Sequence, residues 1–125
     1  MITIFGKTFS IGSFMKGFNQ SPFWDNPSGR GTSEIVKIDS SHIWYKRGKT
    51  TMRISIKLIN DICAYILNNM PKGRKIYTKD IVLIKENVAP GYRGWHDCDA
   101  TFIMMLLRYV LKKKIDGKRP CYVII

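Results

Sequence analysis

The clearest periodic pattern in the chain is a stripe of apolar residues that follows Ser55. Its members recur at spacings of three and four, and they are Ile59, Ile62, Cys63, Ile66, Leu67 and Met70. This spacing places side chains on one face of a helix. Ser55 is a favourable capping residue before the stripe, and Pro71 stops a helix after it. The pattern therefore predicts an amphipathic helix that begins after Ser55 and ends before Pro71.

Residues 34–56 carry a different pattern, which favours strands. The segments E-I-V-K-I-D, H-I-W-Y-K-R and T-T-M-R-I-S are rich in the β-branched and aromatic residues that pack well on a pleated surface. Turn-forming residues separate these segments at Asp39-Ser40-Ser41 and at Gly48. This part of the chain predicts a hairpin or a three-stranded meander.

Beyond residue 73, the order predicts a short strand, R-K-I-Y, then a helix, T-K-D-I-V-L-I-K-E-N, and a third helix that starts at Asp97 or Asp99. Thr78 is expected to cap the second helix. On a helical wheel, one side of the third helix carries Ile103, Leu106, Leu107 and Val110, and the opposite side carries Thr101, Met104, Met105, Arg108 and Lys112. Asp116-Gly117 predicts a tight turn before a final strand, C-Y-V-I-I.

The first 33 residues differ from the rest because they combine glycines with scattered aromatics. They hold five of the ten glycines, and they include Phe14, Phe18 and Trp24. Short strands near Ile2 and Ile4 are expected, but no sustained helix. Residues 1–33 are interpreted as an arm whose aromatics pack on the domain or on a second subunit, and residues 34–125 as one domain. The predicted fold class is α+β, with three helices, an N-terminal hairpin or meander and this aromatic-rich arm.

Charge narrows the class of partner. Lys and Arg number 21 against 9 Asp and Glu, which gives a net charge of +12, and only +2 of it falls in residues 1–33. A basic balance of this size favours polyanions such as DNA, RNA or an acidic surface. An acidic protein partner, or a basic chain with no charged partner, remains the alternative.

The element order from residue 55 onward resembles the winged helix-turn-helix superfamily, over roughly residues 55–125. The resemblance is carried by L-L-R-Y-V-L-K-K-K-I-D-G-K-R-P-C-Y-V-I-I and by the helix start T-K-D-I-V. In that family, the third helix enters the major groove of DNA and the wing touches the neighbouring backbone. The resemblance implies DNA contacts by Thr101, Arg108, Lys112 and Lys113 on the helix, and by Lys118 and Arg119 on the wing.

Two further basic groups lie outside that helix and wing. Lys46, Arg47, Lys49 and Arg53 surround Trp44, and such a hairpin can follow a phosphate backbone and stack bases. The alternative is that Trp44 belongs to the core. Lys72, Arg74 and Lys75 precede the second helix, where they are either auxiliary phosphate contacts or a plain basic loop.

Support for catalysis or for a cofactor is thin. His96-x-Cys98 with Asp97 and Asp99 is the one metal-like cluster, and it has no second close Cys/His pair, so no metal is expected. No phosphate-cradling glycine loop or nucleophile elbow is present, so no catalytic residue is assigned and an enzyme is not expected. A nuclease remains a distant alternative, since Asp25, Glu34, Asp97 and Asp99 could converge.

Location follows from the cysteines and from the hydropathy of the chain. Three widely spaced cysteines do not form a disulfide framework, which favours a reducing, intracellular compartment. No apolar run approaches the ~20 residues of a membrane span, and no secretory signal is recognised.

These patterns predict a DNA-binding protein, a small transcriptional regulator or architectural factor, which grips duplex DNA and dimerises through its N-terminal arm. One alternative is an interaction or inhibitor protein, virus- or plasmid-encoded, that contacts a protein partner through Met104, Met105 and the arm. The other is a binder of single strands or RNA that uses Trp44, Tyr45 and the basic hairpin.

Overall fold

The computed structural model describes residues 1–20, 33–111, 115–118 and 121–124, and its fold class is α+β. Twelve elements follow one another in these ranges. They are β1 (Ile2–Ile4), β2 (Lys7–Phe9), α1 (Ile11–Gln20), β3 (Ser33–Ile38), β4 (His42–Arg47), β5 (Thr50–Ser55), α2 (Ile56–Asn69), β6 (Lys75–Tyr77), α3 (Thr78–Val88), α4 (Asp97–Val110), β7 (Ile115–Lys118) and β8 (Cys121–Ile124).

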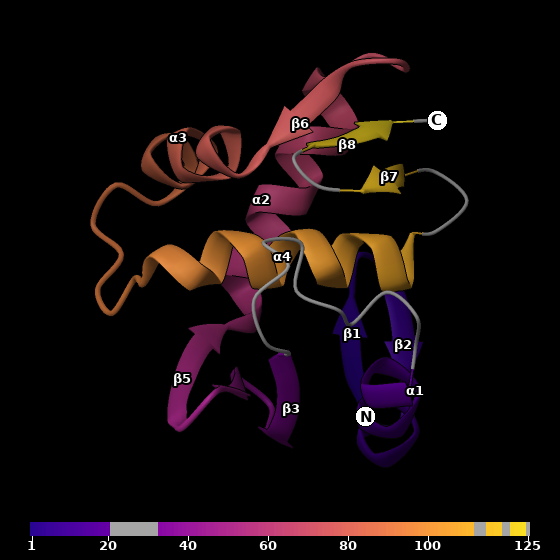
Figure 1. Ribbon diagram of the computed structural model, residues 1–125, viewed down its shortest axis with the longest axis vertical. Helices are drawn as coiled ribbons and strands as arrows, with labels where there is room; N and C mark the ends of the chain where they lie inside the picture. The colour runs from indigo at the N-terminus through magenta and orange to yellow at the C-terminus, as the bar shows by residue number, and fades with distance from the viewer. Residues whose placement is uncertain (21–32, 112–114, 119–120, 125) are drawn as a thin grey trace.

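Helix α4 lies at the centre of the molecule. Figure 1 shows it crossing the middle of the view, with α3 and strands β6 to β8 on one side and β3, β5, β1, β2 and α1 on the other. Its residues from Asp99 to Leu107 are buried, apart from the half-buried Thr101. The helical wheel placed Met104 and Met105 on a side opposite the core. That placement was wrong, because neighbouring elements cover α4 on both sides and leave the two methionines fully buried.

Strands β3, β4 and β5 form the predicted three-stranded antiparallel meander. Pairing is continuous from His42↔Ser55 to Arg47↔Thr50, and a register shift interrupts the β3–β4 pair between Ile35 and Lys37. Alternate residues point to the core, as expected for a sheet with one buried face. The inward row holds Ile35, Ile38, Ile43, Tyr45, Met52 and Ile54.

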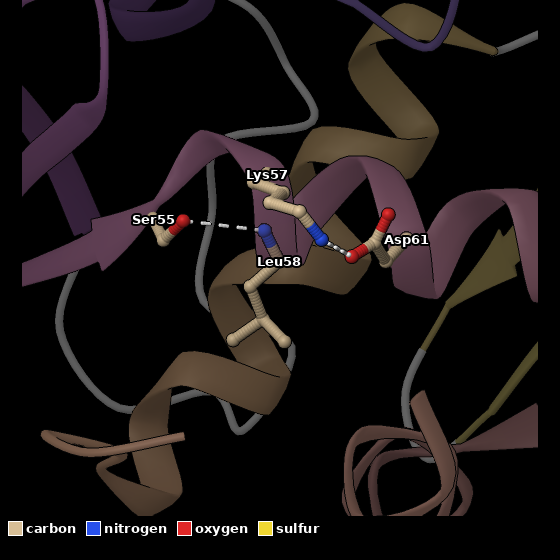
Figure 2. Close-up of polar contacts among 4 residues, drawn as sticks. All are labelled: Ser55, Lys57, Leu58 and Asp61. Carbon is tan, nitrogen blue, oxygen red and sulfur yellow. Dashed lines mark hydrogen bonds and ion pairs between the residues drawn. The ribbon is translucent and has the colours of Figure 1, made fainter. Parts of the chain in front are cut away.

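Helix α2 begins and ends as its sequence predicts. Ser55 is the N-cap, and its Oγ accepts a hydrogen bond from the Leu58 backbone N–H at 3.3 Å, as Figure 2 shows. One turn into the helix, Lys57 Nζ lies 2.7 Å from Asp61 Oδ2 on the exposed side. Leu67 departs from the predicted stripe, because its side chain is exposed.

Helix α3 begins one residue away from its predicted cap. Thr78 is the first helical residue and Tyr77 is the N-cap. Asp80 is the third helical residue, and its Oδ2 accepts a hydrogen bond from the Tyr77 backbone N–H at 2.8 Å. A carboxylate at the third helical position binds the backbone N–H of the residue before the helix, so Tyr77 and not Thr78 is the N-cap.

The N-terminal segment contains a helix where none was expected. In α1, Phe14 and Phe18 are buried, since residues four apart share a helix face. Phe18 packs on Phe102 and on Tyr109, with ring centroids 5.6 and 5.7 Å apart. Tertiary packing therefore outweighs the low helix propensity of the two glycines in this segment. These two phenylalanines lie in the core of their own chain, so they are not available to a second subunit.

The C-terminal strands complete a second sheet of order β6-β8-β7, which is antiparallel throughout. The chain reverses between Lys118 and Cys121, which are paired. Asp116 and Gly117 lie inside β7, opposite Val123 and Tyr122. The predicted turn at Asp116-Gly117 was therefore wrong, because ladder pairing holds both residues in the strand.

Candidate nucleic-acid interface

The outer face of the β3–β5 sheet carries an aromatic residue between two cations. Lys37 on β3 and Arg53 on β5 are the cross-strand partners of Trp44 on the middle strand. Side chains of directly paired residues stand side by side on one face. Trp44 is half-buried while Lys37 and Arg53 are exposed. Tyr45 takes the core position in this strand and is fully buried. The alternative that Trp44 belongs to the core was therefore wrong, and so was the expectation that Tyr45 joins Trp44 in binding single strands.

Trp44 is held by its neighbours on this face. Lys37 Nζ lies 4.6 Å from the centroid of the Trp44 ring, which is within the range of a cation–π contact. The His42 ring lies on the other side along the strand, with centroids 5.8 Å apart. His42 Nδ1 is 2.7 Å from Ser41 Oγ, and this contact fixes the imidazole. The indole therefore contacts both a cation and a second ring on this face.

The same face continues with a second cross-strand row, Glu34, Lys46 and Thr51. Lys46 is exposed, and Lys49 is exposed in the turn that follows β4. Gly48 makes this turn with φ of 61°, a conformation that favours glycine. Glu34 is the one acidic residue in the three strands. The outer face is thus predominantly cationic.

Arg47 is the member of the predicted basic hairpin that lies apart from this face. Its register places it in the inward row with Ile43 and Tyr45, at the end of the strand, and it is half-buried. Its closeness in the chain to Lys46 and Lys49 predicted that the three would share one surface. Strand alternation separates neighbours onto opposite faces.

A buried contact on the inner face fixes the strand that carries Trp44. The Tyr45 ring stacks on Phe102 of α4, with centroids 3.9 Å apart and planes 5° from parallel. Its hydroxyl donates a hydrogen bond to the buried Asp99 carboxylate, whose other oxygen accepts the His96 backbone N–H at 3.0 Å. Burial raises the pKa of Asp99 above the ordinary value, and burial next to Asp99 raises the pKa of Tyr45. The sheet is therefore anchored to the start of α4.

The residues predicted to enter a DNA groove lie in a different environment. Thr101 and Arg108 are half-buried, and Asp97 is the one exposed residue of α4, all of which the structure describes. Lys112, Lys113 and Arg119 lie outside the described residues, and Lys118 lies in β7. As placed here, α4 offers no exposed face that could enter a groove. Full burial of Met104 and Met105 also removes these two side chains from the surface proposed for a protein partner.

The third basic group is exposed but lies elsewhere. Lys72, Arg74 and Lys75 are exposed in and just before β6. Figure 1 shows β6 on the opposite side of α4 from β3 and β5. The structure therefore does not bring this group together with Trp44.

A metal site does not form around the His96-x-Cys98 segment. Among the described residues, no three His, Cys, Asp or Glu side chains group closely enough to hold an ion. Asp99 is held by Tyr45, and Cys98 Sγ lies 2.7 Å from Met52 Sδ. Within the same described ranges, no helix is long and apolar enough to cross a membrane.

Two residues of the outer face were not predicted as site residues, Lys37 and His42. Strand alternation alone would have placed His42 beside Trp44, since the two are separated by one residue. Lys37 could not be placed in this way, because the register shift between Ile35 and Lys37 sets its pairing with Trp44.

Comparison with known proteins identifies no relative: no protein-family model matches the chain, and neither a curated protein nor a solved structure is significantly similar to it. Function is therefore argued from the geometry of this chain.

Proposed function

We propose that this protein binds single-stranded nucleic acid on the outer face of the β3–β5 sheet. The observation that carries the proposal is the cross-strand row Lys37, Trp44, Arg53, with a half-buried indole between two exposed cations. Proteins that bind single strands combine aromatic rings, on which bases stack, with a basic surface that follows the backbone. Unpaired bases can stack on Trp44 while Lys37, Lys46 and Arg53 neutralise phosphates.

Duplex binding is the second candidate, and the second sheet supports it. The order helix, strand, helix, helix and hairpin, with β8 between β6 and β7, agrees with a winged-helix arrangement. In this proposal, the duplex would be gripped by Lys72, Arg74 and Lys75 and by the β7–β8 hairpin. It ranks second because α4, which would enter the groove, is covered along its length.

The test is a fluorescence-anisotropy titration of labelled single-stranded DNA, RNA and duplex DNA at two salt concentrations. Single strands should bind more tightly than duplex, and binding should weaken with salt because each phosphate contact releases counterions. Trp44→Ala should weaken single-strand binding about 5- to 150-fold, which corresponds to the ~1–3 kcal/mol of one stacked base.

Trp95→Phe is the matched control, because it also removes an indole and lies outside the sheet. The affinity of the Trp95→Phe variant for single strands should equal that of the wild-type protein. Equal affinity of the Trp44→Ala and wild-type proteins would overturn the proposed surface. Duplex preference, lost in a Lys72→Gln/Arg74→Gln variant, would select the second candidate instead. Failure of all three nucleic acids to bind would indicate a protein partner.

A further inference from the structure

A cavity of about 300 Å³ lies at the edge of the same sheet, beside β5. Strands β4 and β5 contribute His42, Thr51 and Arg53 to its lining, and the loop between α3 and α4 contributes Tyr92, Arg93 and His96. No lining residue carries a carboxylate. Two arginines and two histidines therefore line a space large enough for a phosphate group with part of its sugar.

The loop that closes this cavity is fixed to the sheet. Tyr92 Oη accepts a hydrogen bond from the Ser55 backbone N–H at 3.2 Å, at the junction of β5 and α2. The Tyr92 backbone N–H donates to Ala89 O at 3.1 Å, and Gly94 has φ of 88°, which favours glycine. These contacts hold the loop that brings Arg93 and His96 to the same cavity as Arg53. A preformed site loses less conformational entropy on binding than a mobile one.

The cavity is continuous with the stacking surface around Trp44. Arg53 is the cross-strand partner of Trp44, and the His42 ring lies 5.8 Å from the indole. Neighbouring strands are about 4.8 Å apart, so the cavity opens one strand away from the indole. Acidic groups lie nearby but outside the lining: Asp39 accepts a hydrogen bond from the His42 backbone N–H, and Asp97 follows His96.

We infer that this cavity binds a phosphate group of the nucleotide whose base stacks on Trp44, an inference that rests on the proposed single-strand function. Planar guanidinium groups bind phosphate through paired, charge-assisted hydrogen bonds. Arg53 and Arg93 supply these bonds from two sides, and the imidazoles of His42 and His96 supply further donors. The phosphate is either internal to the strand or at its 5′ end, and the two share the same chemistry.

Arg93→Gln is the informative variant because Arg93 lines the cavity from the loop and is not part of the sheet. Lys79→Gln is the matched control, since it also removes one positive charge, from an exposed residue of α3 that does not line this cavity. Salt titrations with an unphosphorylated single strand should give a slope of log affinity against log salt that is smaller by about 0.7 in Arg93→Gln, the contribution of one phosphate. Affinity should fall about tenfold, as expected for one lost charge-assisted contact. Lys79→Gln should leave both values unchanged.

A 5′-phosphorylated strand distinguishes the two phosphate sources. If the site takes the terminal group, this strand binds more tightly than its 5′-hydroxyl counterpart, and Arg93→Gln abolishes the difference. If the site takes an internal phosphate, both strands bind alike and Arg93→Gln weakens both. Both outcomes support the inference.

Titration of the full chain with inorganic phosphate, followed by NMR, tests the cavity without nucleic acid. The ring signals of His42 and His96 and the side-chain signals of Arg53 and Arg93 should shift together, and Arg93→Gln should weaken this response at least fivefold, through loss of a charge-assisted donor. A strand that binds through Trp44 with the same salt slope in Arg93→Gln would overturn the inference and leave the proposed function standing. A chain that binds no single strand would overturn both, even if inorganic phosphate still bound.

Discussion

Removing the hydroxyl of Tyr45 tests whether the buried Tyr45–Asp99 contact holds the binding sheet against α4. The Tyr45→Phe substitution keeps the ring that stacks on Phe102 at 3.9 Å and deletes the donor to Asp99. Asp99 then retains the His96 backbone N–H as its donor on the other carboxylate oxygen. A hydrogen bond to a charged group contributes about 1.5–3 kcal/mol. We expect the free energy of unfolding to fall by that amount at pH 7.

The stability lost in Tyr45→Phe should depend on pH. Burial raises the folded-state pKa of Asp99 above its unfolded value, whereas the Tyr45 hydrogen bond opposes that rise. An acid whose pKa is raised on folding binds its proton more tightly in the folded state. Its contribution to stability is therefore fully present below the unfolded pKa and is lost as pH rises through the folded pKa. Deleting the hydroxyl raises the folded pKa of Asp99 further. The difference between wild type and Tyr45→Phe should therefore widen as pH rises from about 3.5 to 7.

Urea denaturation across this pH range measures both effects, and Asp99→Asn separates them. Asp99→Asn cannot ionise, so its stability relative to wild type should increase as pH rises. In the double variant, loss of the Tyr45 hydroxyl should have a cost that no longer depends on pH, and the cycle isolates the coupling of the pair. A Tyr45→Phe cost that is constant with pH in the wild-type background would refute an ionisable Asp99 as its partner.

The remaining predictions concern helix α1 and the start of α2. A Cβ added at Gly17 would lie 2.0 Å from Tyr109 Oη, so Gly17→Ala should lower the free energy of unfolding by about 1–3 kcal/mol, as measured in urea. Gly12 lies in open space on the same helix, so Gly12→Ala should instead raise this free energy by up to ~1 kcal/mol. Stabilisation by both changes would contradict the close packing of α1 on Tyr109. Ser55→Ala should lower the free energy of unfolding by about 1 kcal/mol, because it removes the α2 N-cap. The exposed Ser40→Ala should leave it unchanged, and equal effects of the two substitutions would rule out the cap.

Much of the fold could be predicted from the sequence, because in these parts the local sequence pattern and the tertiary packing favour the same structure. The Ser55 cap, the apolar stripe of α2 and the three strands before it depend on spacing and on turn residues, which the sequence displays directly. Helix α1 could not be predicted in this way. Its glycines disfavour a helix locally, and what stabilises the helix is the packing of Phe14 and Phe18 on residues about ninety positions later.

The candidate site was less predictable than the fold, for a reason that Trp44 and Tyr45 illustrate. The two aromatics are adjacent, and strand alternation puts one in the core and the other on the surface, but composition cannot decide which. Tyr45 takes the core position, where Asp99 accepts its hydroxyl proton in a hydrogen bond. Strand register determines which residues surround Trp44, because it pairs Trp44 with Lys37 on one neighbouring strand and with Arg53 on the other.

The same alternation bears on how the net charge should be interpreted. A charge of +12 favours a polyanion but does not locate it, and the basic residues divide between two sides of α4. On one side, Lys72, Arg74 and Lys75 are accompanied by one exposed aromatic, Tyr77, whose ring centroid lies 5.6 Å from Lys79 Nζ. On the other, the cations flank a half-buried indole and continue into a cavity lined by arginine and histidine. Charge alone attracts either nucleic-acid form, whereas a stacking ring requires bases that are not already stacked in a duplex. The side with Trp44 adds to its ring a cavity lined by two arginines and two histidines, and it is therefore the side that we propose for a single strand.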